Sequence, residues 1–515
     1  MPASSRTAVA AFAEPLRGRW GGVGWRVAVV LFAAFAVLPA RAMLPADVER
    51  LLREASIPNE ALAFVAMRAD SGTVVAEQGA RRPMQPASTM KVLTSVVALD
   101  RLGLGWRSRS ELATDGQTRD GVLVGNLYLR GFGDTDLDVE AFRALLQRLR
   151  DSGIDEIRGD LLLARDWFDP PRPDLGVPPF DETPEFRYNA IPDAIFLNSN
   201  LLEVTLIAEG EGVRVRYVPA LPGVRFTPRF TLAERACADW EDGWQLPQTA
   251  RSANGDIEVV LGGSFPKNCI ATTRLNVLDR NEFVSRLFRS LWRELGGRFD
   301  GSVRDAPPGS ATARLTMLAE HRSRPFAEVL RDIDKRSDNP MARLTYLALA
   351  ERGEGAGASQ PTAALAEQTV RAWLRAEGID DAGLVLDDGS GLSRTEKISP
   401  LQLAQVVRAA LTRPWAPEFL ANLPVAGLDG GLQRRLATPA LRGRARLKTG
   451  TLRDVTALAG VLPSVSGETW VVVAMLNHAK ATSRVSRPIL DRLMLELAAG
   501  FGTRADERVR DGIGP

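Results

Sequence analysis

The order of hydrophobic and polar positions divides the chain into three stretches of different texture. In the first stretch, residues 45–57 and 90–99 carry apolar positions over helical lengths with few turn signals. Between them, residues 62–78 form two β-prone runs on either side of Asp70-Ser71-Gly72. The pattern predicts a helix, a β-hairpin and a second helix. Pro45 falls in the first turn of the first helix, where no intrahelical hydrogen bond is lost.

The second stretch, from about residue 110 to residue 280, alternates short β-type runs with Gly, Pro and Asp turns. A Pro-rich segment at 169–186 predicts a long loop inside it. Apolar runs of this length, bounded by turn residues, are typical of β-strands. We therefore predict a β-rich block, whose runs are "GVLVGNLYLRG", "IRGDLLLARDWF", "LLEVTLIAEGEGVRVRYV" and "GDIEVVLGG".

The third stretch returns to helical patterning at residues 281–297. A capping box of Ser399 and Gln402, with Pro400 at the first helical position, predicts the start of another helix. Three successive apolar runs then predict an antiparallel meander, and an amphipathic helix ending in glycine follows. The runs cover residues 445–451, 455–463 and 467–477, and the last helix covers 488–500.

Length and composition limit the class of protein. A chain of 515 residues exceeds the usual size of one domain, so we expect two or three. Its 45% hydrophobic and 25% charged residues are ordinary for a globular protein. The formal net charge of +2 gives no basic field for nucleic acid, and we expect no nucleic-acid partner.

The N-terminus resembles an export signal. Arg17, Arg19 and Arg26 precede an apolar run at 27–40, and "ARA" ends at Ala42. This order of charged region, short apolar region and small-residue cleavage site predicts a signal peptide at 1–42 and a periplasmic mature protein. The alternative is an uncleaved anchor, but the apolar run is too short to span a bilayer comfortably. No later stretch is long and apolar enough to be a transmembrane segment.

Cysteine and histidine are scarce. The only cysteines are Cys237 and Cys269, and export favours a disulfide between them. The only histidines, His321 and His478, lie far apart in the sequence, so we expect no metal site and no cofactor. They are also the only candidates for a Ser-His-Asp triad, and we interpret each as a polar or structural residue.

Lysine is rare as well, and its positions carry the first chemical signal. The chain has six lysines among 65 basic residues, and one of them, Lys91, follows Ser88 by three positions. Residues at this spacing share a helix face. A serine hydroxyl needs a base before it becomes a nucleophile. Lysine can lose its proton when desolvated, whereas arginine cannot. Ser88 and Lys91 therefore form a candidate nucleophile and base.

Two further motifs strengthen this weak signal. Ser337-Asp338-Asn339 follows a predicted helix, and Lys448-Thr449-Gly450-Thr451 lies on a predicted strand. The three motifs together, in this order, are the signature of penicillin-binding proteins and class A β-lactamases. Lys91 would take the proton of Ser88, and Ser337 with Lys448 would pass it to a leaving amine. The charge of Lys448 would also lower the pKa of Lys91.

The other motif residues are interpreted as substrate-binding groups. Asn339 would hydrogen-bond a substrate amide, and Gly450 would leave room for the substrate backbone beside the strand. Thr449 and Thr451 would offer hydroxyls to a terminal carboxylate. The backbone N–H groups of Ser88 and Thr451 would form an oxyanion hole.

With these motifs, the chain resembles the class C low-molecular-mass penicillin-binding proteins, the D-Ala-D-Ala carboxypeptidase/endopeptidase family S13. Residues 129–137, 188–200, 387–394 and 423–432 also resemble family stretches, with departures at Phe132 and Gly431. The resemblance implies an α/β (α+β) fold of the DD-peptidase/serine β-lactamase type, an antiparallel sheet flanked by helices. The implied organisation is a catalytic domain at 43–112 and 281–515, interrupted by a β-rich insertion at 113–280.

The resemblance also implies a function. Such an enzyme cleaves the D-Ala-D-Ala ends and cross-links of peptidoglycan stem peptides through an acyl-enzyme on Ser88, and β-lactam antibiotics acylate and inhibit it. The alternatives are a serine β-lactamase or esterase of the same fold, and a non-catalytic cell-wall binding protein. Two patterns imitate the deacylating glutamate of β-lactamases, but we interpret both as structural and expect slow release of penicillin. They are Glu185-x-x-x-Asn189 and Glu418-x-x-x-Asn422.

Aromatic residues of the predicted insertion leave two interpretations open. Trp167, Phe168, Trp240 and Trp244 have side chains that can stack on glycan, and they can equally form the buried core of a small β-domain. We favour the second interpretation.

Overall fold

The structure is a computed structural model that describes residues 44–175, 183–350, 360–464 and 466–500. The predicted signal peptide at 1–42 lies outside these residues. A five-stranded antiparallel sheet with the order β18-β19-β20-β1-β2 forms the centre of the motif-bearing part. The predicted hairpin and meander are therefore confirmed, and they join in one sheet. The strands are β1 Leu62–Arg68, β2 Val74–Gln78, β18 Arg446–Leu452, β19 Val455–Pro463 and β20 Thr469–Asn477.

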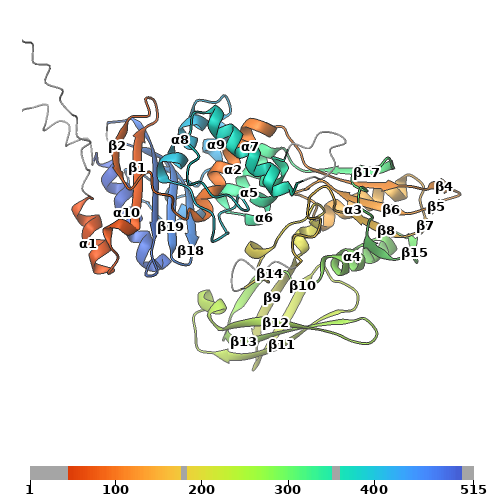
Figure 1. The fold of residues 1–515 in the computed structure, drawn as a ribbon. Helices are drawn as coiled ribbons and strands as arrows, with labels where there is room; N and C mark the ends of the chain where they lie inside the picture. Colours follow the sequence, from red (N-terminus) through yellow and green to blue (C-terminus); the bar gives the residue numbers. More distant parts are fainter. Residues whose placement is uncertain (1–43, 176–182, 351–359, 465, 501–515) are drawn as a thin grey trace, which may run out of the picture. The chain divides into compact units, whose positions relative to one another are not determined.

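Helices cover both faces of this sheet (Figure 1). Alternate residues of β1 enter different cores, because successive side chains of a strand point to opposite faces. Phe64 packs with α1 and α10, whereas Val65 packs with the helices of the other face. Both residues are fully buried. The helices are α1 Ala46–Glu54 and α10 Ser483–Ala498 on one face; the other holds α2 Met90–Leu102, α5 Phe326–Lys335, α6 Asn339–Ala348, α7 Thr362–Ala376, α8 Pro400–Leu411 and α9 Ala416–Asn422.

The predicted capping box is present at the start of α8. Ser399 Oγ accepts the backbone N–H of Gln402 at 3.2 Å, and Gln402 Oε1 accepts the N–H of Ser399 at 2.8 Å. Two orphan donors of the helix end are satisfied in this way. The amide of Gln402 also donates to Asp380 O and Ala382 O, so the cap fixes the loop that precedes it.

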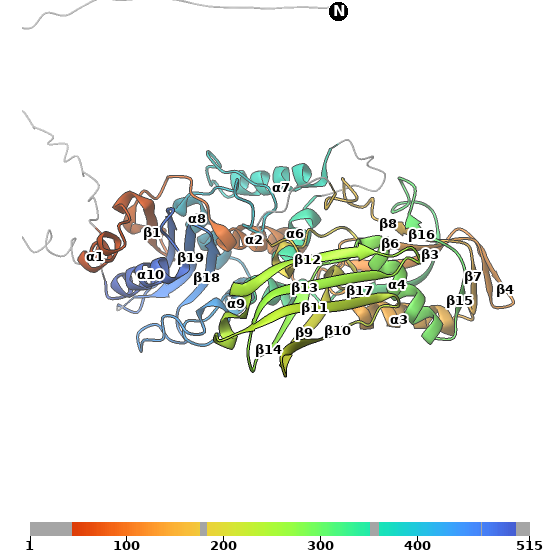
Figure 2. The same cartoon turned by 90° about the horizontal axis from the view of Figure 1, so that it is seen from below.

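The middle of the chain forms four further sheets with a core of their own. Their strand orders are β16-β8-β6-β3-β17, β15-β7-β5-β4, β10-β9-β14 and β11-β13-β12, and Figure 2 shows the last of these sheets in full. The β-rich character predicted for this part is thus present. The strands are β3 Arg109–Thr114, β4 Gln117–Arg119, β5 Val122–Val124, β6 Leu127–Gly131, β7 Glu156–Arg158, β8 Leu161–Ala164, β9 Leu202–Glu209, β10 Gly212–Val218, β11 Val224–Ala233, β12 Trp244–Arg251, β13 Ile257–Pro266, β14 Ile270–Leu275, β15 Arg298–Phe299, β16 Val303–Asp305 and β17 Thr316–Arg322.

Two helices pack against these sheets. The first, α3 (Val139–Asp151), was not predicted, although its amphipathic pattern and its N-cap Asp138 are both legible in the sequence. Asp138 accepts the N–H of Ala141 at 2.8 Å. The second, α4 (Arg280–Glu294), begins one residue before the predicted helix at 281–297 and ends three residues before its end. The middle of the chain is therefore mixed in content, not purely β.

Strand pairing bears on the predicted domain boundaries of 43–112, 113–280 and 281–515. Strand β17 pairs with β3, and β15 and β16 pair with β7 and β8, so strands on both sides of residue 280 share sheets. Where the chain enters and leaves this region, Ser108 and Ser323 bond to each other. The Ser323 N–H donates to Ser108 O at 2.9 Å, and the Ser108 N–H donates to Ser323 Oγ at 3.0 Å. We propose that the inserted region spans residues 108–323.

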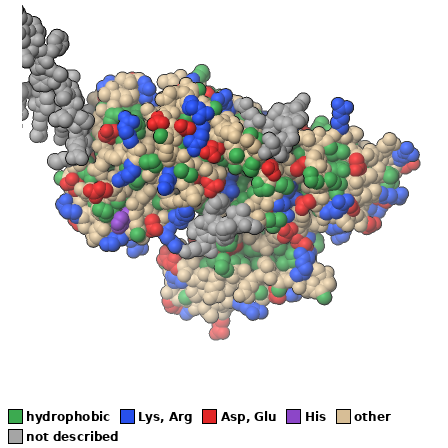
Figure 3. All heavy atoms as spheres, viewed as in Figure 1, with side chains coloured by type: hydrophobic (Ala, Val, Ile, Leu, Met, Phe, Trp, Pro, Cys, Tyr) green, Lys and Arg blue, Asp and Glu red, His purple; other side chains and the backbone are tan. Residues whose placement is uncertain are grey.

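A disulfide joins Cys237 to Cys269 within the inserted region, as predicted. Beside it, Trp240 and Trp244 pack at right angles with ring centroids 5.6 Å apart, and both contact Phe186. These half-buried aromatics support the core interpretation. On the face in Figure 3, acidic and basic side chains are interspersed. No helix within the described ranges has the length and hydropathy needed to cross a membrane.

Candidate active site

Ser88 lies in a single turn of 3-10 helix, Ala87–Thr89, that leads into α2. Ala87 has a left-handed backbone with φ of 47°, an uncommon conformation for a residue with a side chain. Gly391 lies against this turn, and a Cβ there would come within 1.8 Å of Ala87 O. The "DDGSGLSR" stretch therefore supports the turn that presents Ser88.

Lys91 is fully buried and points its amine at three oxygen atoms. Its Nζ donates to Ser88 Oγ at 2.9 Å, to Asn339 Oδ1 at 2.5 Å and to Ser390 O at 2.6 Å. Burial lowers the pKa of Lys91 to about 8, although nearby carboxylates, Asp388 foremost, oppose this shift. The contact expected from the spacing of Ser88 and Lys91 is present, and the amine is poised to release a proton near neutral pH.

A second lysine and serine repeat this arrangement. Ser337 has a left-handed backbone, with φ of 59°, in the turn between α5 and α6. Lys448 is fully buried on β18, and its Nζ donates to Ser337 Oγ and to Thr449 O, both at 2.9 Å. Burial lowers the pKa of Lys448, and the charge of Lys91 lowers it further. From the sequence we expected the charge of Lys448 to lower the pKa of Lys91. In the structure, burial is the main cause of the lowered pKa at both amines.

Asn339 is held by the protein at both ends of its amide. Its Oδ1 accepts from Lys91, and its Nδ2 donates to the carbonyl of Tyr188 at 3.0 Å. Tyr188 belongs to the inserted region, so this hydrogen bond ties the motif to the insertion. One N–H of the Asn339 amide is left over for the substrate contact that the sequence analysis predicted.

Gly450 has a neighbour that the sequence did not reveal. A Cβ at this position would lie 2.7 Å from Pro86 O and 3.2 Å from Ser88 N. The glycine therefore lets β18 approach the Ser88 turn, a role within the protein that differs from the substrate role we expected. Thr449 has a similar constraint, since a Cβ on Gly431 would lie 2.3 Å from its Oγ1. Thr451 is exposed on β18.

Two buried carboxylates near the lysines were missed. Asp334 is fully buried on α5, one turn before Ser337, and accepts a hydrogen bond from Ser95 Oγ at 3.4 Å. Burial raises its pKa, and the charges of Lys448 and Lys91 oppose that rise. The available signal was an acidic residue on the apolar face of a predicted helix.

Glu396 is the second missed carboxylate. It is fully buried and accepts four backbone N–H groups of the loop before it. Those of residues 387, 388 and 389 donate to Oε1 at 3.2, 3.1 and 2.8 Å, and that of Gly391 donates to Oε2 at 2.8 Å. These bonds fold the loop so that Ser390 O faces Lys91. Glu396 thus acts on the amine through the backbone.

The two histidines, Glu185 and the asparagines of the two Glu-x-x-x-Asn patterns form hydrogen bonds with groups outside the three motifs. His321 Nδ1 lies 2.7 Å from Asp134 Oδ2, and His478 Nδ1 accepts the N–H of Lys480 at 3.1 Å. Within the described residues neither histidine is hydrogen-bonded to Ser88. Glu185 accepts the indole N–H of Trp244 at 2.7 Å. Asn189 and Asn422 donate to the backbone oxygens of Thr183 and Ala327.

A pocket of about 720 Å³ opens beside Ser337 and Asn339, and we call it the active-site pocket. Its wall combines the motif residues with residues of the inserted region. The latter are Thr183, Phe186, Arg187, Tyr188, Glu203, Glu241, Trp244, Thr272, Thr273 and Arg274. The site therefore combines two serines, two buried amines and a cavity for a substrate. These are the groups that acyl transfer to a serine requires.

Comparison with known proteins agrees with this geometry. The chain is 27% identical over 493 residues to the D-alanyl-D-alanine carboxypeptidase of Actinomadura sp. (strain R39), covering 91% of this chain and 87% of that protein. It is 29% identical over 425 residues to the D-alanyl-D-alanine carboxypeptidase DacB of Haemophilus influenzae, covering 80% and 85%.

The fold matches a solved structure. Penicillin binding protein 4 (dacB) from Haemophilus influenzae, which has also been solved in complex with a β-lactam, superimposes with a TM-score of 0.70 at 23% identity. The match covers 90% of this chain and 99% of that one. The family model of the D-Ala-D-Ala carboxypeptidase 3 (S13) family matches residues 44–497. The chain therefore belongs to the D-Ala-D-Ala carboxypeptidase 3 (S13) family, as the sequence resemblance indicated.

Proposed function

We propose that this chain is an exported serine DD-peptidase that cleaves D-Ala-D-Ala ends and cross-links of peptidoglycan through an acyl-enzyme on Ser88. One observation carries the proposal: two buried lysines each hydrogen-bond a serine at 2.9 Å, Lys91 with Ser88 and Lys448 with Ser337. Buried amines with lowered pKa values accept and return protons near neutral pH, as general acid–base catalysis requires.

In the first step, Ser88 Oγ attacks the carbonyl carbon of the penultimate D-Ala while Lys91 takes the hydroxyl proton. The N–H groups of Ser88 and Thr451 stabilise the oxyanion, each contributing about 3 kcal/mol as in comparable enzymes. The C–N bond then breaks, and the proton that Lys91 took is relayed by Lys448 and the Ser337 hydroxyl to the leaving amine, so that Lys91 is neutral again. The products are an ester on Ser88 and a free D-amino acid or second stem peptide.

In the second step, water attacks the ester carbonyl and gives a proton to Lys91, which returns it to Ser88 Oγ as the ester C–O bond breaks, so that a carboxylic acid product and the free serine result. A β-lactam enters the first step in the same way, but its amine stays tethered after the ring opens. We expect this acyl-enzyme to persist, because Glu185 is buried beside Trp244 and does not line the active-site pocket, so its carboxylate has no access to water at the ester. A fast serine β-lactamase is therefore the less favoured function.

Export is part of the proposal. The signal-like sequence at 1–42 directs the chain to the periplasm, and the disulfide between Cys237 and Cys269 accords with an oxidising compartment.

The test combines acylation with turnover. Wild-type protein and Ser88→Ala are incubated with benzylpenicillin, and the mass of the intact protein is followed over time. We expect the wild-type protein alone to gain one penicilloyl group and to lose it slowly. The same two proteins are given a stem pentapeptide, and D-Ala release is measured. Rapid loss of the acyl group would favour a β-lactamase, and acylation without D-Ala release would favour a cell-wall binding protein.

A further inference from the structure

A second and larger cavity of about 940 Å³ adjoins the active-site pocket and is lined by the inserted region together with residues of α5 and α6. We call it the insertion cavity. Four residues line both spaces, so the two spaces share a border. They are Arg187, Glu203, Arg274 and Arg336. Because Arg336 directly precedes Ser337, this border starts beside the serine proposed to protonate the leaving amine.

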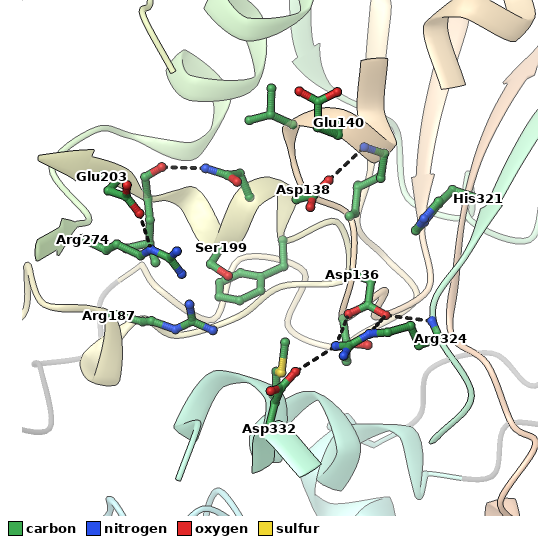
Figure 4. A pocket seen from close by; sticks show the side chains of 18 of the residues that line it. Asp136, Asp138, Glu140, Arg187, Ser199, Glu203, Arg274, His321, Arg324 and Asp332 are labelled. Atoms are coloured by element: carbon green, nitrogen blue, oxygen red, sulfur yellow. Dashed lines mark hydrogen bonds and ion pairs between the residues drawn. The ribbon is translucent and has the colours of Figure 1, made fainter. Parts of the chain in front are cut away.

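The walls of the insertion cavity carry charges of both signs. Six arginines and five carboxylates line it. On one side Arg324 pairs with Asp136 at 2.8 Å and with Asp332 at 2.9 Å, and on the other Arg274 pairs with Glu203 at 3.1 Å. Figure 4 shows these two groups facing each other, with Ser199 between them. A ligand suited to such walls carries both carboxylates and an amine.

One wall is built from strained backbone. Phe196, Asn198, Ser199 and Asn200 have φ values of 36°, 49°, 55° and 56°, all in the left-handed region. Non-glycine residues rarely adopt this conformation, and runs of it persist only where the surroundings enforce it, often at functional sites. Here the Asn198 N–H donates to Leu137 O at 2.7 Å, and Asn200 Nδ2 donates to Leu278 O at 2.8 Å. Three of these residues, Phe196, Asn198 and Ser199, line the cavity.

The size of the insertion cavity fits a peptide ligand. Its volume of about 940 Å³ lies within the range of peptide and drug-sized sites, far beyond what a single D-Ala needs.

We propose that the insertion cavity binds the second stem peptide of a cross-linked peptidoglycan substrate, the half that departs with the leaving amine. This rests on the proposed function of Ser88. A cross-link joins the scissile carbonyl to an amine of another stem peptide, which is a short peptide with several carboxylates. From the Ser337 hydroxyl this peptide passes Arg336 and enters the cavity. A terminal D-Ala leaving group stops at the active-site pocket.

The test fills the cavity without touching the motifs. Ala141 lines the cavity in the first turn of α3, whereas Ala144 on the same helix is exposed and does not line it. Ala141→Trp and Ala144→Trp are compared on a purified cross-linked muropeptide dimer, on an uncross-linked pentapeptide and on benzylpenicillin. We expect Ala141→Trp to raise KM for the dimer about tenfold, the equivalent of one charged hydrogen bond. Its penicillin acylation and D-Ala release should stay within about twofold of wild type, and Ala144→Trp should resemble wild type throughout.

A second pair removes charge. Arg274 and Arg298 each pair with a glutamate on the neighbouring strand, at 3.1 and 3.0 Å, but only Arg274 borders the cavity. We expect Arg274→Ala to raise KM for the dimer at least about threefold and Arg298→Ala to leave it unchanged. Equal dimer kinetics within both pairs would overturn the proposal. Failure of wild-type protein to acylate or to release D-Ala would instead remove the proposed function.

Discussion

The motif-bearing part and the inserted region use charged side chains in different ways. Around Ser88, the charged groups are sealed from solvent, and Lys91, Lys448 and Asp334 all have a relative exposure of 0%. Around the insertion cavity, the arginines of the ion pairs are partly exposed. The side chains of Arg274 and Arg324 are 50% and 42% exposed, and the carboxylates range from 41% at Glu203 to 12% at Asp332. Both regions combine cations with carboxylates, but the solvent exposure of the two sets differs.

That difference in exposure decides what the groups can do. Burial disfavours the charged form of an amine or a carboxylate and moves its pKa toward neutrality, so the sealed groups can exchange protons. Exposed pairs keep their charges, and each contributes only about 0–1 kcal/mol to stability. They can exchange their partner for a ligand at little cost. The first arrangement suits catalysis, and the second suits recognition.

The largest expected effect tests whether proton exchange is needed at Lys91. Lys91→Arg keeps the positive charge but cannot accept the proton of Ser88. We expect the rate of penicillin acylation to fall by at least the roughly 10²–10⁴-fold of a lost general base. Lys448→Arg should lose less, because part of the work of Lys448 is to keep a positive charge beside Lys91. The penicillin acylation rates of both variants are measured, and thermal melts check that both variants are folded. Equal rates in folded proteins would show the base assignment to be wrong.

The next prediction tests whether acylation depends on the close packing of Gly391 against the turn that carries Ser88. Gly391 and Gly378 both have left-handed backbones, with φ of 79° and 68°, but a Cβ on Gly378 would meet nothing within 4 Å. We expect Gly391→Ala to slow acylation about tenfold or more, because the new methyl collides with Ala87 O beside the nucleophile. Gly378→Ala should lower stability by about 1 kcal/mol through backbone strain alone and leave acylation unchanged. Melting temperature and acylation rate are measured for both, and slower acylation in the Gly378 variant would mean that strain alone explains the loss.

The two regions also differ in how far the sequence predicts them. The central sheet, the capping box of Ser399 and the contact between Ser88 and Lys91 depend on short spacings or on motifs of fixed residue type. The insertion cavity depends on side chains such as Asp136, Ser199 and His321, which come together only through the pairing of distant strands. No local pattern encodes that pairing.

Asp334 and Glu396 lie in the catalytic region, but the sequence did not predict their importance either. Each is a single acidic residue in an ordinary stretch, and its importance comes from burial. Glu396 collects its four N–H groups only because the loop at 387–391 closes around it. Helix α3 was missed for another reason, since its amphipathic pattern lies inside a block dominated by turns and short β-runs.

A smaller effect sharpens the electrostatic side of the comparison. The Asp334 carboxylate is among the charges that raise the pKa of Lys91 against the lowering by burial. Acylation needs the neutral amine, so its rate should rise with pH through a pKa of about 8. Asp334→Asn removes a negative charge, which destabilises the ammonium form and lowers the pKa of Lys91. We expect the acid limb of the pH profile to move down by roughly one pH unit.

The control for this shift is Asp100→Asn. Asp100 is also on the Ser88 helix α2, but it accepts the indole N–H of Trp373 at 2.9 Å and is not among the groups that shift Lys91. Its pH profile should match that of the wild-type protein. An unchanged or upward-moving acid limb in Asp334→Asn would contradict the electrostatic account.

The smallest expected effect on acylation concerns the inserted region itself. The disulfide closes a loop with a sequence separation of 32, and in the chain-entropy model such a link stabilises by roughly 3–4 kcal/mol. Replacing both Cys237 and Cys269 by serine should therefore lower the unfolding temperature of the protein. Five residues accept hydrogen bonds from the two lysines, and none of them belongs to the loop that the disulfide closes: Ser88, Ser337, Asn339, Ser390 and Thr449. We expect penicillin acylation at 25 °C to change less than about twofold, while cleavage of a cross-linked dimer, which depends on the insertion cavity, should weaken more. If acylation falls as much as dimer cleavage, the separation of catalysis around Ser88 from substrate recognition at the insertion cavity is wrong.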